Sequence, residues 1–333
     1  MKHIDFLQAI LLFFATTTIL IRPAHSAHSA RKRTPSRRIN TAKYDRSISI
    51  FNEDGQLLQV DYAIHGTTLR GQPILCMSYN NTAVLCIVDS INNKSAEGQI
   101  MVAEKVHRVD EGILLVTTGL AGDGRTLAQS TRMTCQRLRM DRGEPPTVYE
   151  VAREVASIQH ELTRTAGARP IGCTATVIGL NAAGQQRNND NNAVQLFQSE
   201  PGGVLEEYNF CAAGKQRREF EDKLDDLWGE IAFTASRTND GDGDNNVQKI
   251  KDDSNVTILE KMVRGMVKII LDDPNYANDV SDGDNGNNAL NCMMDLWMLQ
   301  PDSTRRGGVK IKCARGVTRV DDVEKLFASS TGT

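Results

Sequence analysis

Apolar residues gather in two pairs of short runs early in the chain. The first pair covers 74–77 and 83–88, with the polar Asn80 and Asn81 between the two runs. The second pair covers 102–109 and 113–120, with a short polar stretch that ends at Gly112. Two apolar runs joined by a short polar turn are typical of a β-hairpin. The pattern therefore predicts two successive hairpins.

A helical period follows the hairpins. Thr147 and Glu150 form a capping-box pattern, in which each side chain satisfies a free backbone N–H group of the first turn. The apolar residues from 151 to 162 then recur on one helical face, and Gly167 supplies a stop signal. Weaker helical patterns cover 126–142, 217–228 and 256–271.

The order of the segments predicts the fold class. Further strands are expected at 168–181, 292–299 and 309–313. Hairpins and helices occur in separate groups and do not alternate, which favours an α+β fold with antiparallel sheets over a doubly wound parallel sheet. Stretches rich in Asn, Asp and Gly are expected to be surface insertions, near 181–192, 234–254 and 275–288.

Charge and cysteine content exclude some kinds of binding partner and some kinds of cross-link. The 333 residues carry a net charge of −3, and residues 1–43 alone carry +7, so the remainder carries −10 (−3 minus +7). An acidic body argues against a nucleic-acid surface. The seven cysteines are scattered and include no CxxC pair. We expect them to be core thiols, not a disulfide framework.

No metal and no cofactor are expected. The histidines have no spacing to cysteine that suits a zinc site. Asp240, Asp242 and Asp244 resemble the start of a calcium loop. The sixth loop position is Asn245 where Gly is needed, and the twelfth is Lys251 where Glu is needed, so an EF-hand is excluded.

The N-terminal region has two parts. Residues 1–30 combine a short basic start, an apolar run and small residues, the pattern of a secretory signal, and the run is short for a membrane span. Residues 31–43 form a basic, disordered linker by composition. Sequons at Asn80, Asn93 and Asn255 matter only if the chain enters the secretory pathway.

Residues 44–63 read YDRSISIFNEDGQLLQVDYA. This stretch resembles the N-terminal signature of proteasome α-type subunits, in which a YDR opening, a phenylalanine, a DG turn and a QVEYA-like helix occur in this order. The segments 105–125 and 168–181 resemble later parts of the same family. The resemblance is close over 44–230 and extends to 255–330 by element order. It implies one domain over 44–333, a four-layer αββα sandwich of two antiparallel sheets flanked by helices.

The resemblance also implies a function. An α-type subunit is a non-catalytic part of the 20S proteasome core, where it forms the outer ring, gates substrate access and docks activators in ubiquitin-dependent degradation. The implied partners are other α subunits, β subunits and the activators or regulatory particle, in cytoplasm and nucleus. No nucleic acid and no stable membrane span are expected. The alternative is a diverged secretory or organellar paralogue outside the proteasome.

Two sites follow from the resemblance. The activator-docking pocket maps to Lys105, Gly119 and Leu120. A lysine can pair with a chain-end carboxylate, and glycine allows a backbone to pass close beside it.

The gate and its N-terminal turn map to Tyr44, Asp45, Glu53 and Tyr62. Glu53 stands where the family has proline, and glutamate does not fix φ as proline does. We therefore expect a softer turn. The following residues, 64–68, are poor helix formers where the family has a charged helical run.

A self-processing threonine peptidase that uses Thr67 is a further alternative. Related β subunits free an N-terminal threonine after a glycine, and its amine serves as the general base. Gly66-Thr67 looks like such a cleavage point. Asp89 and Lys105 fall where β-type enzymes keep their supporting residues, but alignment of the hairpin puts Gln72 and Pro73 where the threonine would sit. No catalytic residue is therefore assigned.

Overall fold

The computed structural model describes residues 48, 50–90, 104–165, 167–181, 194–238, 247–276, 292–302 and 308–317. All of these residues belong to the compact unit Ala42–Thr333. Several predictions lie outside them: those for residues 1–43, for Tyr44 and Asp45, for the sequon at Asn93, and for most of the three polar insertions.

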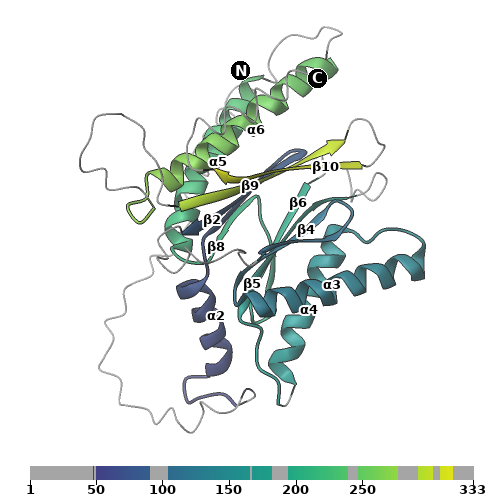
Figure 1. Ribbon diagram of the computed structural model, residues 1–333, viewed down its shortest axis with the longest axis vertical. Helices are drawn as coiled ribbons and strands as arrows, with labels where there is room; N and C mark the ends of the chain where they lie inside the picture. Colours follow the sequence, from purple (N-terminus) through teal and green to yellow (C-terminus); the bar gives the residue numbers. More distant parts are fainter. Residues whose placement is uncertain are drawn as a thin grey trace, which may run out of the picture. The chain divides into compact units, whose positions relative to one another are not determined.

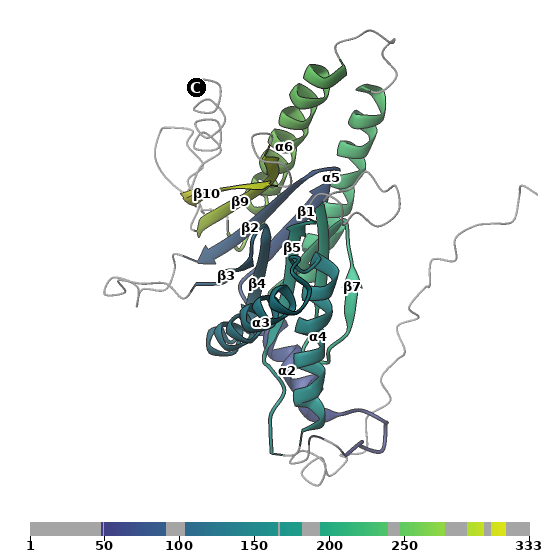
Figure 2. The same ribbon diagram turned by 90° about the vertical axis from the view of Figure 1, so that its right-hand side faces the viewer.

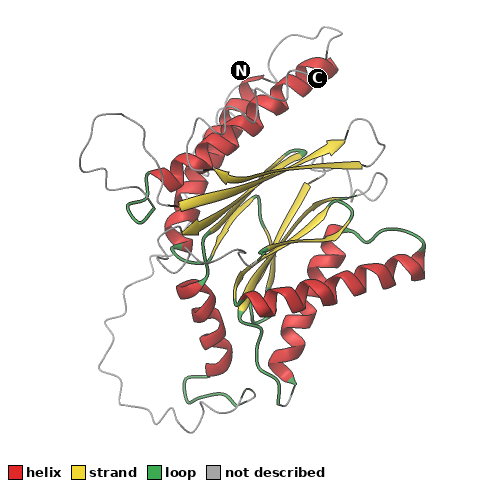
Figure 3. Ribbon diagram, viewed as in Figure 1, coloured by secondary structure: helices red, strands yellow, loops and turns green. Residues whose placement is uncertain are grey.

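Two five-stranded antiparallel sheets form the centre of the unit (Figures 1 and 3). The first sheet has the order β10-β9-β2-β1-β8, and the second has the order β3-β4-β5-β6-β7. The strands of the first sheet are β1 (Ile74–Tyr79), β2 (Thr82–Ser90), β8 (Phe210–Ala213), β9 (Cys292–Asp302) and β10 (Gly308–Val317). Those of the second are β3 (Val106–Asp110), β4 (Ile113–Gly119), β5 (Cys173–Leu180), β6 (Val194–Ser199) and β7 (Leu205–Glu207).

Helices cover the outer face of each sheet (Figure 2). Helices α3 and α4 pack on the second sheet, and α5 and α6 pack on the first. A shorter helix, α2, precedes β1 and contacts β4 and β5. The bounds are α2 (Leu58–Arg70), α3 (Ala121–Arg142), α4 (Val148–Arg164), α5 (Arg217–Thr238) and α6 (Val247–Leu271).

Three hydrophobic cores separate the four layers. The middle core lies between the sheets, where Leu85 of β2 and Leu196 of β6 are both completely buried. One outer core joins the first sheet to α5 and α6, and the other joins the second sheet to α3 and α4. This arrangement confirms the predicted αββα sandwich of two antiparallel sheets.

Local sequence signals predicted most of these elements. Both hairpins are present, and α4 begins with the predicted capping box: Glu150 N donates to Thr147 Oγ1 at 3.2 Å, and Thr147 N donates to Glu150 Oε2 at 3.0 Å. Gly167 has a φ of +79°, which suits a stop signal. Five of the cysteines are buried and form no disulfide, as expected of core thiols, whereas Cys313 is exposed.

Helix bounds differ from the prediction in three places. Helix α3 begins at Ala121 instead of residue 126, α5 continues to Thr238, and α6 begins at Val247. The last two extend into the stretch 234–254, which we expected to be a surface insertion. The two helices contact each other, and tertiary contact commonly outweighs weak local helix propensity. No helix among the described residues is both long and apolar enough to span a lipid bilayer.

Candidate functional site

The structure brings the predicted docking residues to one end of the β3–β4 pair. Lys105 precedes β3, and its carbonyl accepts a hydrogen bond from Thr117 N at 3.0 Å. It therefore lies opposite β4 two residues before Gly119, where β4 ends. The Lys105 side chain is half-buried, and Leu120 is 52% exposed. A cation and an accessible apolar side chain thus share this corner of the second sheet.

Backbone crowding explains the glycine at this corner. Gly119 has a φ of +124°, and a Cβ atom there would lie 2.3 Å from the carbonyl oxygen of Gly172. Leu120 N donates to that same oxygen at 2.9 Å. A side chain at position 119 would separate the two segments, since non-bonded heavy atoms cannot approach so closely. The corner therefore depends on glycine for both conformation and space.

An ion pair that the sequence analysis missed holds the corner in place. Arg169 donates to both carboxylate oxygens of Asp123, at 2.6 and 2.7 Å, and Gly172 N donates to Asp123 Oδ2 at 2.9 Å. The hydrogen bonds from Arg169 lower the pKa of Asp123 against the opposing effect of burial. Both partners lie in the segments that carry the family resemblance, but nothing in the sequence pairs residues so far apart.

The N-terminal turn is held by Asn52, which the sequence analysis also passed over. Its Oδ1 accepts hydrogen bonds from Asp54 N at 3.0 Å and from Gln56 N at 2.7 Å, as in an Asx turn. Gly55 N donates to Asn52 O at 3.0 Å. Glu53 is exposed in this turn, so the missing proline is offset by side-chain hydrogen bonds from its neighbour. That the turn is softer than one with proline stays a prediction.

Of the predicted gate residues, the structure describes Glu53 and Tyr62. Tyr62 lies on α2 and is 47% exposed, while Tyr44 and Asp45 are outside the described residues. Whether the four residues form one cluster thus stays a prediction.

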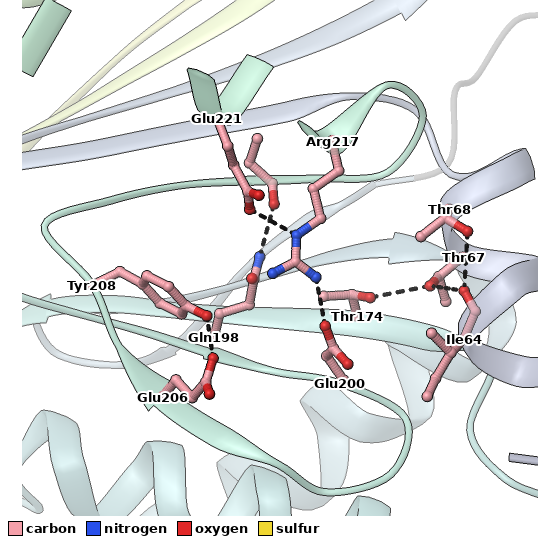
Figure 4. Close-up of polar contacts among 11 residues, drawn as sticks. Ile64, Thr67, Thr68, Thr174, Gln198, Glu200, Glu206, Tyr208, Arg217 and Glu221 are labelled. Atoms are coloured by element: carbon pink, nitrogen blue, oxygen red, sulfur yellow. Dashed lines mark hydrogen bonds and ion pairs between the residues drawn. The ribbon is translucent and has the colours of Figure 1, made fainter. Parts of the chain in front are cut away.

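Thr67 lies inside α2, which runs unbroken through the poor helix formers (Figure 4). Its side chain is 1% exposed; its hydroxyl donates to Ile64 O at 2.8 Å and accepts from Thr174 Oγ1 at 3.2 Å. These contacts tie the helix to β5 and explain why it persists here. The Gly66–Thr67 bond lies inside a regular helix, away from any turn or loop that would present it for cleavage.

A second threonine, Thr118, packs against the residues just before β1 and hydrogen-bonds to them. Thr118 Oγ1 donates to Gln72 O at 2.7 Å, and a Cβ on Gly71 would lie only 2.6 Å from that hydroxyl. Neither Gln72 nor Pro73, the residues that the sequence comparison of the hairpin aligns with the nucleophile position, has a hydroxyl group. Asp89 lies on β2, paired with Met293 of β9. Burial also raises the pKa of Cys173 to about 12, which keeps this thiol protonated and unreactive.

Comparison with known proteins decides the family. The profile described as "Proteasome subunit" matches residues 68–234, about half of the chain, and the profile for the N-terminal signature of A-type proteasome subunits matches residues 44–65. The chain belongs to the proteasome subunit family. Since the second profile is specific to α-type members, the chain is an α-type subunit.

Named relatives agree with this assignment. The proteasome alpha subunit of Methanococcus maripaludis strain C6 is 32% identical over 174 residues, which cover 52% of this chain and 62% of the relative. That of Methanothermobacter thermautotrophicus is 31% identical over 192 residues, 56% of this chain and 73% of the relative. The alpha type-7 proteasome subunit of Caenorhabditis elegans is 30% identical over 190 residues, covering 56% and 70%. The chain thus spans less than two thirds of the first of these relatives.

A polar cluster anchors α5 of this α-type subunit to the second sheet (Figure 4). Arg217 pairs with Glu221 at 2.7 Å and with Glu200 just after β6. Burial opposes the charge on Arg217, but the hydrogen bonds to the two glutamates outweigh it and raise the pKa of the guanidinium. Beside them, burial and the hydrogen bond to Glu206 raise the pKa of Tyr208. The cluster thus links helix α5 to the end of strand β6 by ion pairs.

Metal ligation finds no support in the described part of the α-type subunit. No group of three His, Cys, Asp or Glu side chains gathers there in a way that could hold an ion. Asp240, Asp242 and Asp244, which resemble a calcium loop, lie outside the described ranges.

Proposed function

We propose that this α-type subunit is a non-catalytic member of the outer ring of a 20S proteasome core. It packs beside other α subunits and on the β ring, and limits substrate access to the β-ring proteases. Its sites of action are the cytoplasm and nucleus, in ubiquitin-dependent degradation. The named relatives, which are themselves proteasome α subunits, support this assembly.

The observation that carries the non-catalytic proposal is the environment of Thr67. A threonine nucleophile needs a free hydroxyl and a nearby general base, which in related enzymes is its own α-amine. Here the Thr67 hydroxyl is buried, donates to a carbonyl of its own helix and accepts from Thr174, and the preceding bond lies within that helix. Cleavage before Thr67 would also remove the α-type signature at 44–65.

The activator-docking role is proposed for the Lys105, Gly119 and Leu120 corner. An ammonium group can pair with the C-terminal carboxylate of an activator tail, and the exposed Leu120 offers an apolar contact next to it. Gly119 allows the tail backbone to approach. The proposal is supported by the way in which Gly172 and Asp123 fix this corner.

Native purification tests the assembly and the catalytic silence together. A C-terminally tagged chain should co-purify with α and β subunits, and particles with Thr67→Ala should keep the peptidase activity of particles with Thr68→Ala, the adjacent control. Loss of activity in intact Thr67→Ala particles would refute the non-catalytic proposal. A mature N-terminus near residue 31 without proteasome partners would instead favour the secretory alternative.

Docking needs its own variant. Lys105→Glu should weaken binding of a synthetic activator-tail peptide to the assembled particle by roughly tenfold or more, because attraction between the ammonium group and the tail carboxylate is replaced by repulsion. Lys310→Glu, an exposed lysine on β10, is the matched control. Equal loss in both variants would show that overall charge, not the corner, determines binding.

A further inference from the structure

A groove between α5 and α6 lies on the side of the sandwich away from the docking corner. Its volume is about 300 Å³, and Leu227 and Ile231 of α5 form its apolar floor. The helices approach closely here, because a Cβ on Gly265 would lie 2.4 Å from Leu227 Cδ1. The groove is therefore built into the helix crossing and does not depend on a mobile loop.

One wall of the groove is cationic. Lys261, Arg264 and Lys268 line it from α6, at a spacing of i, i+3 and i+7 that places them on one face. Arg264 pairs with Glu260 at 2.6 Å, and Lys261 Nζ makes a 3.4 Å hydrogen bond to the Thr234 hydroxyl.

Lys268 has the least compensated charge of this wall. Its ammonium group makes no hydrogen bond or ion pair with any other residue that the structure describes. Glu230 is the one carboxylate among the lining residues. The groove thus combines an apolar floor with an excess of positive charge.

The connection between the two helices is too short to fill the groove. Residues 239–246 join α5 to α6, and a loop of this length tied at both ends extends on the order of 14 Å at most. Lys268 lies roughly 30 Å along α6 from Val247, at about 1.5 Å per residue. An occupant that pairs with Lys268 must come from elsewhere.

We propose that this groove docks an acidic segment of a partner protein, with a branched aliphatic side chain between its carboxylates. The aliphatic group would contact Leu227 and Ile231, and the carboxylates would pair with Lys261 and Lys268. The volume is enough for an anchoring side chain, and the charge of the wall favours an acidic partner over a basic one. This surface is separate from the docking corner and acts independently of it.

The test uses the full chain and a dye-labelled synthetic peptide with a leucine pair flanked by glutamates. We expect saturable binding that weakens as salt rises, because the contact charges are exposed. The double variant Lys261→Glu/Lys268→Glu should lower the affinity by about tenfold or more. The matched control, Lys310→Glu/Lys312→Glu on β10, carries the same charge change and should bind as the wild type does.

A second measurement locates the peptide. A photoreactive leucine in the same peptide should cross-link to residues 227–234 and 261–268, and replacing the leucines by serines should abolish the cross-link. Cross-links elsewhere, or equal binding by both double variants, would overturn the proposal. Markedly tighter binding after residues 277–291 are replaced by a Gly/Ser linker would also overturn it, because an acidic segment of the chain itself would then be the occupant.

Discussion

Two helix pairs enclose the sheets of this α-type subunit, α3 with α4 on one side and α5 with α6 on the other. The α3–α4 side is fixed by local interactions near helix ends. These are the capping box at Thr147, the left-handed conformation of Gly143 after α3, and the ion pair of Arg139 with Asp110. The α5–α6 side relies on a fully buried apolar row in α6 and on the close crossing at Gly265.

The difference teaches where structural information lies in the chain. Capping signals are local and can be read within a few residues, so the start of α4 after Thr147 was predicted correctly. Close packing between helices depends on partners far apart in sequence. The family profile also ends at residue 234, inside α5, so the two sides differ in their likeness to relatives.

The largest expected effect tests the apolar side. Phe220→Ala should destabilise the chain by about 3–5 kcal/mol, because Phe220 is fully buried between the first sheet, α5 and α6. Val151→Ala, equally buried on α4, should cost only about 2 kcal/mol, since it removes less apolar volume. Urea unfolding of both variants gives the comparison. A loss at Phe220 no larger than that at Val151 would mean that the α5–α6 side collapses into the space left by the ring.

The helix crossing provides the second test. Gly265→Ala should cost about 1–3 kcal/mol, because the new methyl group overlaps Leu227. Gly229→Ala, on α5 with no atom near the new methyl group, should stabilise by about 0.5–1 kcal/mol through helix propensity. Thermal unfolding of the pair separates the two effects. A stabilising Gly265→Ala would show that the Leu227 side chain moves aside at little cost.

On the polar side, Thr147→Ala should cost about 0.5–2 kcal/mol, because it leaves the N–H group of Glu150 without its cap. Thr147→Ser keeps the hydroxyl and should lie close to the wild type. Hydrogen exchange at the first turn of α4 should rise in the alanine variant alone. No change in that exchange would argue that packing, not capping, fixes the helix end.

The smallest effect concerns the docking corner. Asp123→Asn should cost no more than about 1 kcal/mol at neutral pH, since Arg169 is largely exposed. The pKa of Asp123 is lowered in the fold, so its contribution is present above the unfolded pKa of about 3.9 and is lost as pH falls through the folded value. The difference between wild type and variant should therefore shrink at acid pH. A difference that does not shrink at all as pH falls below the unfolded pKa of about 3.9 would contradict this ion-pair account.

Sequence reasoning predicted the sandwich because alternation and capping are local patterns. It could not pair Asp123 with Arg169, because no sequence pattern shows which of many distant opposite charges come into contact in the fold. It could have found Asn52, because asparagine before a DG pair is a turn signal in its own right. The lengths of α5 and α6 were not predicted, because residues 234–254 are rich in Asn, Asp and Gly, which favour turns and loops over helices.

The strand order of the two sheets has a consequence for biosynthesis. The second sheet uses strands in their order along the chain and has all its members once residue 207 has been made. In the first sheet, β2 ends at Ser90 but pairs with β9, which begins at Cys292. During translation, one edge of β2 thus stays unpaired while some two hundred further residues are made. An unpaired strand edge can pair with other chains, so this stage favours aggregation or chaperone binding. Half of the sandwich can mature on the ribosome, whereas the other half depends on the last strands to leave it.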